Sequence, residues 1–214
     1  MDNELDLLAR KYDTDKRTND AGQNIYHGYT PIYEQYLKHK RLSKNNILEI
    51  GVREGSSHKM WEEYFPNSTI YGIDDFSDIA CTVKKEDMES DRIKIIVGNQ
   101  SDKELIDSNF KDISLDVVID DGSHRSWHQQ ESFKYLWKYL ESGGLYFIED
   151  LAVCYMREFR EFDDIRSSTL QWLQKIKDKK IPYCYYIDTD DMRKTCSEIE
   201  SVDIIGELAI IKKK

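Results

Sequence analysis

Carboxylates gather in two short stretches of the sequence, Asp-Asp-Gly-Ser-His at residues 120–124 and Glu-Asp at residues 149–150. Asp121, Glu149 and Asp150 offer oxygen ligands, which suit a hard cation such as Mg²⁺ (or Mn²⁺) that keeps waters or substrate oxygens in its other positions. A structural zinc site would need cysteines or several histidines close by, and the sequence places none there. The two stretches therefore predict a magnesium site.

A histidine follows the first of these carboxylates by three residues. His124 is the right residue type for a general base near neutral pH, and a hydroxyl bound to a metal beside it is acidified, so His124 and Asp121 are the predicted catalytic pair. The alternative is that His124 only caps or packs the start of the next helix. His128, one turn later, is a weaker candidate for a supporting role. His39 and His58 lie among polar helix residues and are expected at the surface.

The segment Glu-Ile-Gly-Val-Arg-Glu-Gly at residues 49–55 is a second candidate site. It is similar to the dinucleotide fingerprint G-x-G-x-x-G, but it lacks the middle glycine and would oppose a pyrophosphate with Glu49. A ligand with an amine and a ribose fits better, because Glu49 can accept from an ammonium, Gly51 lets the backbone approach and Asp74 can take both ribose hydroxyls. S-adenosylmethionine has these groups and no phosphate. The predicted cofactor-binding residues at the strand ends are Glu49, Gly51, Gly55, Asp74, Asn99 and Asp120.

The charge of the chain limits its partners. Among 214 residues, 31 Lys and Arg face 41 Asp and Glu, a net charge of −10, which repels phosphate backbones and argues against nucleic acid. No apolar run approaches the ~18–20 residues that cross a bilayer, and the acidic start lacks the pattern of a secretion signal, so we expect no membrane partner and a cytoplasmic location. The four cysteines form no C-x-x-C pair and are expected to be reduced.

Short apolar runs alternate along the chain with segments of helical periodicity, and together they predict the strands and helices that position these residues. The expected strands cover residues 47–50, 69–73, 94–97, 116–119 and 145–148. Their short, continuous apolar runs suit parallel strands covered by helices on both faces. Helices are expected at 56–64, at 133–140 (closed by Gly143 and Gly144) and at 165–176. Because ligands bind beyond the carboxyl ends of such strands, the acidic residues should converge on one edge.

The two ends of the chain complete the predicted fold. Leu5, Leu8, Ala9 and Tyr12 have the spacing of one helix face, and a second helix starts at residues 30–31. Two further strands, 183–187 and 208–211, are expected with a charged loop between them. The prediction is a doubly wound, Rossmann-like α/β domain: an N-terminal helical segment (residues 1–42) followed by an S-adenosylmethionine-binding domain (residues 43–214).

The acidic strand ends resemble those of the metal-dependent sugar O-methyltransferases of macrolide and related antibiotic pathways, the mycinamicin VI 2''-O-methyltransferase type, with cephalosporin hydroxylase-like and rhamnosyl methyltransferase proteins nearby. The residues that carry the resemblance are Glu49, Gly51, Asp74, Asp121, His124, Glu149 and Asp150. The resemblance covers about residues 12–150. It implies a class I methyltransferase fold, a seven-stranded sheet whose last strand is antiparallel. It also implies Mg²⁺ held by the three carboxylates of residues 121, 149 and 150, with the histidine as base.

The resemblance also implies that the N-terminal segment forms a lid over the cofactor and the sugar. It implies that Tyr29 contacts the cofactor and that Tyr12, Lys16 and His27 contact the acceptor. The alternative is a polar loop with tyrosines that only pack against helices. The stretch after Asp150, Leu-Ala-Val-Cys-Tyr-Met, departs from the family's pattern where the acceptor would lie.

These features together predict methyl transfer from S-adenosylmethionine to a hydroxyl of a sugar or glycosylated metabolite, as in natural product biosynthesis. A catechol-type O-methyltransferase would also place a metal at these strand ends, but it commonly uses a lysine as base. A nicotinamide-dependent dehydrogenase is disfavoured by Glu49, Glu54 and the missing glycine. A cofactor-binding module without catalysis stays open. Families of this kind commonly self-associate, which makes a homo-oligomer possible, although the sequence itself does not indicate the oligomeric state.

Overall fold

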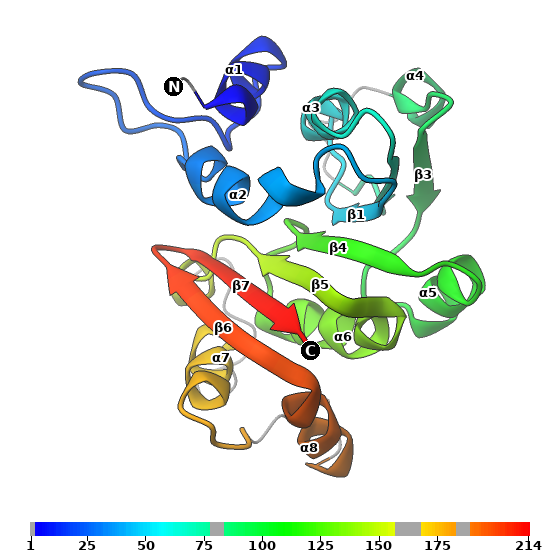
Figure 1. Cartoon of the computed structure of the whole chain (residues 1–214), viewed down its shortest axis with the longest axis vertical. Coiled ribbons are helices and arrows are strands. Elements are labelled where there is room, and N and C mark those ends of the chain that lie inside the picture. Colours follow the sequence, from blue (N-terminus) through cyan, green and yellow to red (C-terminus); the bar gives the residue numbers. More distant parts are fainter. Residues whose placement is uncertain (1–2, 78–83, 157–167, 183–188) are drawn as a thin grey trace.

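The computed structural model describes residues 3–77, 84–156, 168–182 and 189–214 and contains one seven-stranded sheet. The strand order is β3-β2-β1-β4-β5-β7-β6, and β1 to β5 are parallel, whereas β7 is antiparallel to both of its neighbours. The strands are β1 (Asn46–Ile50), β2 (Thr69–Asp74), β3 (Ile93–Val97), β4 (Leu115–Asp120), β5 (Leu140–Ile148), β6 (Ile199–Ile205) and β7 (Leu208–Lys213). The predicted doubly wound α/β fold with seven strands is confirmed (Figure 1).

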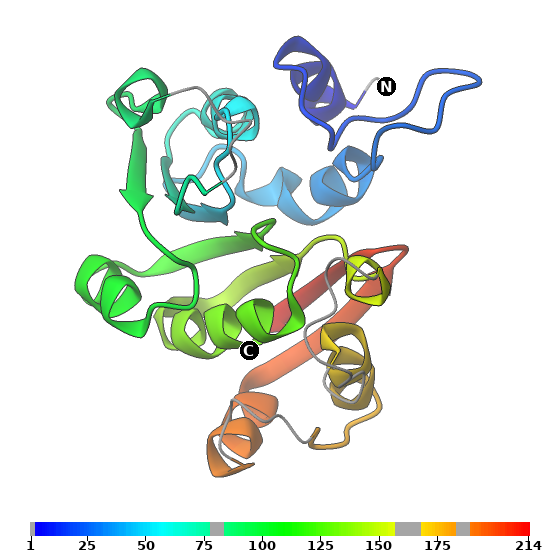
Figure 2. The same ribbon diagram turned by 180° about the vertical axis from the view of Figure 1, so that it is seen from behind.

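The helices of the described ranges lie on both faces of the sheet (Figures 1 and 2). They are α1 (Glu4–Lys11), α2 (Thr30–Leu37), α3 (Ser56–Tyr64), α4 (Lys85–Met88), α5 (Lys103–Phe110), α6 (Ser126–Leu136), α7 (Thr169–Lys177) and α8 (Thr189–Glu198). Side chains cap the first turns of some of these helices. Asn3 caps α1, where its side chain accepts from the backbone N–H of Asp6, and Asp102 caps α5 in the same way. None of these helices, in the described residues, has the length and apolar character needed to cross a membrane.

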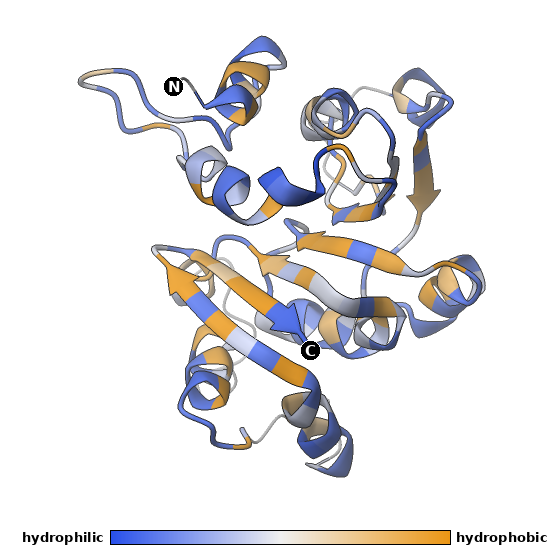
Figure 3. Cartoon of the chain, in the orientation of Figure 1, coloured by the Kyte–Doolittle hydropathy of each residue, from blue (hydrophilic) through white to orange (hydrophobic). Residues whose placement is uncertain are grey.

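Successive strand residues face opposite sides, so the sheet separates two buried clusters. Ile47 of β1 and Phe147 of β5 pack with α1, α2 and α3, whereas Leu48 and Tyr146 pack with α5, α6 and α7. Figure 3 shows hydrophobic residues concentrated along strands such as β4 and β5. Since Leu5 of α1 belongs to the first cluster, the N-terminal segment shares a core with the sheet. The predicted boundary at residue 42 stays a prediction.

The prediction of a charged loop before the last strand is wrong. Helix α8 and strand β6 occupy this region, and β6 forms the partner of β7. β6 is an edge strand in which Ile199 and Val202 are buried while Glu200 and Ser201 are exposed, and a register shift breaks its alternation, so its strand pattern is weak. The strand predicted at residues 183–187 lies outside the described residues.

Gly143 and Gly144 do not close a helix as predicted. Helix α6 ends at Leu136, and both glycines lie within β5. Between the pairs Leu115–Leu140 and Val117–Leu145 the register shifts, which leaves extra residues on β5, and Gly143 takes a φ of +75° in this irregularity. The two glycines therefore mark a bulge, which is the other common role of glycine in a strand.

Candidate functional site

The carboxyl ends of β1, β4 and β5 bring the acidic residues together, as the sequence predicts. Ile50 is in register with Asp120, and Asp120 with Ile148. The backbone continues this pairing by one residue, because the N–H of Asp121 donates to Ile50 (3.0 Å) and that of Glu149 donates to Asp120 (3.0 Å). The residues that follow β1, β4 and β5 therefore leave the sheet side by side, next to the reversal of strand order between β1 and β4.

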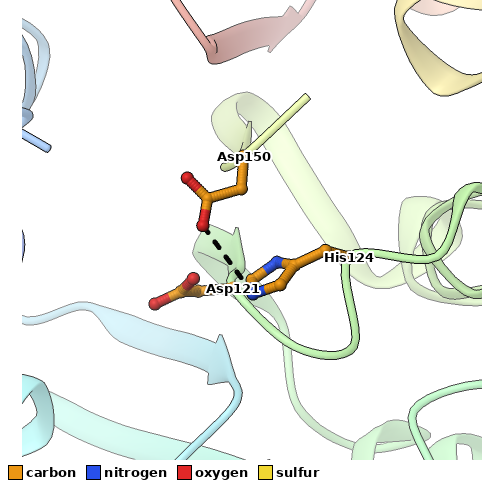
Figure 4. A group of neighbouring side chains, drawn as sticks. All are labelled: Asp121, His124 and Asp150. Carbon is orange, nitrogen blue, oxygen red and sulfur yellow. Dashed lines mark ion pairs between the residues drawn. The ribbon is translucent and has the colours of Figure 1, made fainter. Parts of the chain in front are cut away.

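Side chains at this edge form two groups that could hold a cation. In the outer group, Asp121, His124 and Asp150, and in the inner group, Glu49, Asp121 and Glu149, the ligand atoms lie within 4.8 Å of one another. Figure 4 shows the outer group, in which Nε2 of His124 is 3.7 Å from Oδ2 of Asp150. Within the described residues, the predicted ligand trio is thus divided between two groups, and Asp121 belongs to both.

The ammonium of Lys16 fills the inner group. Its Nζ is 2.9 Å from Oε1 of Glu149 and 3.4 Å from Oε1 of Glu49, and it pairs with Oδ2 of Asp121. The Lys16 side chain is 1% exposed. Burial alone would lower the pKa of Lys16, but the surrounding carboxylates raise it well above its ordinary value. Lys16 therefore carries a positive charge, and it pairs with these carboxylates, a role that differs from the predicted contact with the acceptor.

The surroundings of the inner group raise the pKa values of its three carboxyl groups. Burial raises the pKa of Glu149 well above its usual range, and the charge of Asp121 adds to this effect. Burial also raises the pKa of Asp121 and Glu49, while Lys16 opposes the shift at both. One ammonium therefore offsets only part of the cost of placing Asp121 beside two buried carboxyl groups, those of Glu49 and Glu149.

The N-terminal segment reaches the same strand ends through side chains around α2. The Tyr29 hydroxyl donates to Oδ1 of Asp150 (2.8 Å), and Nδ1 of His27 lies 3.2 Å from the same oxygen. The Tyr33 hydroxyl donates to Glu149. Tyr29 and His27 therefore position the carboxylate of Asp150.

The other predicted contact of this segment lies elsewhere. The Tyr12 hydroxyl donates to Glu63 of α3, where Lys11 also forms an ion pair, and Tyr12 does not line the pocket described below. The structure thus brings Lys16, His27 and Tyr29 to the carboxylates, and Tyr12 remains outside the site.

Two residues of the outer group adopt the left-handed backbone conformation. His124 has a φ of +57° and Asp150 a φ of +56°. Each such residue costs about 1–3 kcal/mol and persists only where the surrounding structure fixes it, and these conformations cluster at functional sites. Their presence on adjacent loops, with the side chains directed toward one another (Figure 4), favours a functional role for this group.

A pocket of about 480 Å³ opens next to the outer group and is lined by the loops after β1, β2, β3 and β4 and by residues 13–16 of the N-terminal segment. Gly51 lines this pocket: its φ is +90°, and a Cβ would lie 2.0 Å from the carbonyl oxygen of Asp121, so only glycine fits where this turn meets the backbone after β4. Asp74 also lines the pocket, but its Oδ2 accepts from the N–H groups of Val52 (2.7 Å) and Arg53 (2.8 Å). Asp74 therefore fixes the turn after β1, and the neighbouring Asp75 is the exposed carboxylate.

Some predicted cofactor residues lie beneath the pocket surface. Asn99 and Asp121 line it, whereas Glu49, Gly55, Asp120 and Tyr29 are not among its lining residues. Asp120 is fully buried, accepts from Nε2 of Gln100 (3.1 Å), and has its pKa raised to about 7 by burial. Glu49 accepts from Ser57 (2.7 Å) and Trp61 (3.1 Å), so it supports the first turn of α3 from behind.

The prediction that His58 lies at the surface is wrong. His58 is fully buried on α3, with Nδ1 3.2 Å from Oε2 of Glu49. Burial, together with the charge of Lys16, lowers the pKa of His58 to about 4, so the imidazole is neutral at pH 7. Its spacing of three residues before Trp61 and seven before Phe65 is that of a buried helix stripe and could have identified it. His39 is exposed as expected, and His128 lines the pocket.

Known proteins with named activities are similar to this chain. Over 160 residues it is 34% identical to the 8-demethyl-8-(2-methoxy-alpha-L-rhamnosyl)-tetracenomycin-C 3'-O-methyltransferase of Streptomyces olivaceus. The aligned region covers 71% of this chain and 38% of the relative. The chain is also 34% identical over 164 residues to the mycinamicin VI 2''-O-methyltransferase of Micromonospora griseorubida, covering 73% of this chain and 38% of the relative. The chain thus spans about two fifths of the length of these relatives. No family model matches it.

Solved structures agree with these relatives. The MycE methyltransferase from the mycinamycin biosynthetic pathway, in complex with Mg, SAH and mycinamycin VI, superposes with a TM-score of 0.79 at 29% identity, covering 98% of this chain and 54% of that one. A putative caffeoyl-CoA O-methyltransferase from Staphylococcus aureus, at 15% identity and a TM-score of 0.55, shares the fold alone. By sequence and fold, the chain belongs to the class I sugar O-methyltransferase family of these antibiotic-pathway enzymes.

Proposed function

We propose that the chain transfers a methyl group from S-adenosylmethionine to a hydroxyl of a sugar on a glycosylated small molecule, with Mg²⁺ or Mn²⁺ as a cofactor. The observation that carries this proposal is the outer group at the edge of the pocket, where His124 and Asp121 line the wall next to Asp150. Incubation with S-adenosylmethionine and a panel of glycosylated acceptors, followed by mass spectrometry of the products, tests it.

The pocket suits a donor with a positive charge. Acidic side chains outnumber basic ones on its wall, where the carboxylates are Asp13, Asp15, Glu54, Asp74, Asp75 and Asp121 and the cations are Lys16 and Arg53. A sulfonium and an amino group are favoured by this wall, whereas a pyrophosphate is repelled. Gly51 lines the same wall, where the absence of a side chain lets the turn after β1 lie against the backbone of Asp121.

His124 is the proposed base. As the acceptor oxygen attacks the methyl carbon and the carbon–sulfur bond breaks, the hydroxyl proton passes to the imidazole of His124, and neutral S-adenosylhomocysteine leaves. Much of the rate enhancement should come from holding oxygen, carbon and sulfur in line, since effective molarity supplies about 7–11 kcal/mol in well-oriented reactions. The fixed backbone of His124 and Asp150 serves this positioning.

The outer group fits the proposed metal ion. Two carboxylates close to the solvent-facing pocket are what Mg²⁺ commonly uses, and Mn²⁺ also tolerates an imidazole nearby. A divalent ion bound there would hold acceptor oxygens and lower the pKa of the reacting hydroxyl. The proposed ligands are Asp121, Glu149 and Asp150, of which Asp121 and Asp150 belong to the outer group. Glu149 also accepts from Tyr33 and from Lys16.

Removal of divalent ions should stop turnover. Dialysis against EDTA is expected to abolish methylation, and added Mg²⁺ or Mn²⁺ to restore it, because the acceptor would no longer be held or activated beside His124. Product formation followed before and after chelation measures this. Binding of S-adenosylhomocysteine, measured in the same samples, is the control and should persist. Full activity in EDTA would remove the metal from the proposal.

The hydroxyl of Tyr29 should matter through Asp150. Tyr29→Phe removes the hydrogen bond to Oδ1 of Asp150 and is expected to weaken Mn²⁺ binding by about 10–100-fold, as the loss of outer-shell partners does at other metal sites. Isothermal titration with Mn²⁺ measures the affinity. Tyr36→Phe is a matched control, since the Tyr36 hydroxyl bonds Asp203, outside the site. Equal Mn²⁺ affinities for the two variants would contradict this role of Tyr29.

A catechol-type mechanism is less favoured by the pocket. Such enzymes commonly use a lysine as base, and among the residues that line the described pocket the lysine is Lys16. Its raised pKa and its pairing with carboxylates make it a poor base. Methylation of a catechol but of no sugar would reverse this ranking, and binding of S-adenosylmethionine without any methylation would favour a non-catalytic module.

Homo-oligomerisation and a cytoplasmic location stay predictions.

A further inference from the structure

We infer that Ser123 is a positioning residue for His124: a closed hydrogen-bond network holds Ser123 from two sides and thereby fixes the turn that carries the imidazole. The network consists of Ser123, of Gln100 after β3, and of His128 and Ser132 on α6. The catalytic consequence rests on the proposed function, in which His124 is the base, whereas the network itself does not.

The side-chain amide of Gln100 holds the backbone of Ser123. Its Oε1 accepts from the N–H of Ser123 (2.8 Å), while its Nε2 donates to Asp120 (3.1 Å) and to Oγ of Ser132 (2.9 Å). An amide turned over would point its NH₂ at the N–H of Ser123, so these contacts fix one orientation of the buried Gln100 side chain. Gly122 leaves room for the amide, because a Cβ there would lie 2.3 Å from Oε1.

The imidazole of His128 holds the side chain of the same serine. Its Nδ1 lies 2.5 Å from Oγ of Ser123. Burial, together with the charge of Arg125, lowers the pKa of His128 to about 4, so the imidazole is neutral at pH 7. Ser132 closes the network, since its hydroxyl donates to the carbonyl of His128 (2.7 Å) and accepts from Gln100. The loop after β3, the loop after β4 and α6 are therefore joined at Ser123.

His124 needs such an anchor because of its backbone. Its φ of +57° lies in the left-handed region, which residues other than glycine keep only where the surrounding structure fixes them. Ser123 directly precedes His124, and α6 starts at Ser126, so the turn is held at both ends. In this position Nε2 of His124 lies 3.7 Å from Oδ2 of Asp150 (Figure 4). Without the Ser123 anchor, the turn should relax and move the imidazole away from the acceptor.

Ser123→Ala tests the anchor by the loss of a single oxygen atom. It removes the contact with His128 and keeps the N–H that donates to Gln100. With a sugar acceptor that the wild type methylates, kcat is expected to fall by about 10–100-fold, because a small misplacement of a reacting group has effects of this size. The affinity for S-adenosylhomocysteine, measured by calorimetry, should stay near that of the wild type. Ser68→Ala is the matched control and should keep full kcat, since it removes a buried hydroxyl that bonds Asn45 just before β2.

Substitutions at His128 separate positioning from a general loss of packing. In asparagine, as in histidine, the polar atom in question is bonded to Cγ, so the amide can place its oxygen or its NH₂ where Nδ1 lies. His128→Asn should therefore keep kcat near that of the wild type, whereas His128→Leu should lower it as much as Ser123→Ala does. The double variant Ser123→Ala, His128→Leu should lose no more than either single variant, because both remove the same contact.

Amide hydrogen exchange, followed by NMR, reports on the turn without any acceptor. The N–H at position 123 donates to Gln100, and its protection factor should fall by about 2–10-fold in Ser123→Ala and in His128→Leu, the effect of losing one hydrogen bond. His128→Asn and Ser68→Ala should keep the protection of the wild type.

The outcomes distinguish this inference from the proposed function. Unchanged kcat in Ser123→Ala, or unchanged protection at position 123, would overturn the inference, and so would equal losses in His128→Asn and His128→Leu. A loss of S-adenosylhomocysteine affinity with kcat unchanged would make Ser123 a cofactor contact instead. If the wild type methylates no acceptor, the proposed function fails, and the exchange measurement alone decides the inference. If His128→Leu does not fold, the comparison of Ser123→Ala with Ser68→Ala decides it.

Discussion

Replacement of His124 with alanine should lower kcat by about 10²–10⁴-fold while the affinity for S-adenosylhomocysteine stays near that of the wild type. The reason is that the acceptor hydroxyl would lose its proposed proton acceptor, whereas the turn after β1 that lines the donor pocket does not depend on the imidazole. Steady-state kinetics with a sugar acceptor that the wild type methylates and calorimetric titration of S-adenosylhomocysteine measure the two quantities separately.

Two further variants separate proton transfer from structural effects. His124 has a φ of +57°, which alanine adopts with some strain, whereas asparagine tolerates this conformation better and still lacks a suitable base. His124→Asn should therefore lose as much activity as His124→Ala and keep more of the stability. His39→Ala, at an exposed histidine of the N-terminal segment, is the control and should be fully active. Near-normal turnover in His124→Asn would remove this residue from the mechanism.

The sheet edge was predictable because each strand that carries a site residue is a short buried run. The runs at residues 47–50 and 116–119 predict β1 and β4, and the rule that parallel strands bind ligands at their carboxyl ends then places Glu49, Asp121 and Glu149 near one another. The β6 edge strand was not predictable in this way. Its exposed residues alternate with buried ones only in part, and a charged sequence is equally typical of a loop.

The division of the acidic residues into two groups could not be predicted from the sequence. Position in the chain indicates that a carboxylate follows a strand, but not which of its neighbours it faces. Asp74 and Asp120 are examples, since Asp74 accepts from the backbone of the turn after β1 and Asp120 accepts from Gln100 beneath the pocket. Lys16 was missed as the partner of Glu149 because the two residues are 133 positions apart, and no local pattern connects them.

The glycine at the centre of the site should be the position least tolerant of change. Gly51→Ala is expected to destabilise the fold by about 2–6 kcal/mol, the sum of backbone strain and overpacking, each of which typically costs about 1–3 kcal/mol. Gly51 has a φ of +90°, and its Cβ would lie 2.0 Å from the carbonyl oxygen of Asp121. That oxygen belongs to the backbone after β4, so relief of the overlap must separate the ends of β1 and β4.

A glycine elsewhere in the chain separates these two costs. Gly22 has a φ of +82°, but no atom lies within 4 Å of where its Cβ would be, so Gly22→Ala should carry the backbone strain alone. Urea unfolding of both variants measures the difference, and equal free energies of unfolding would show that the contact with Asp121 is unimportant. Because Asp121 belongs to both groups, movement of its backbone should also weaken Mn²⁺ binding in Gly51→Ala and leave it intact in Gly22→Ala. The same contact that shapes the donor pocket would then also hold the carboxylate shared by the metal and Lys16.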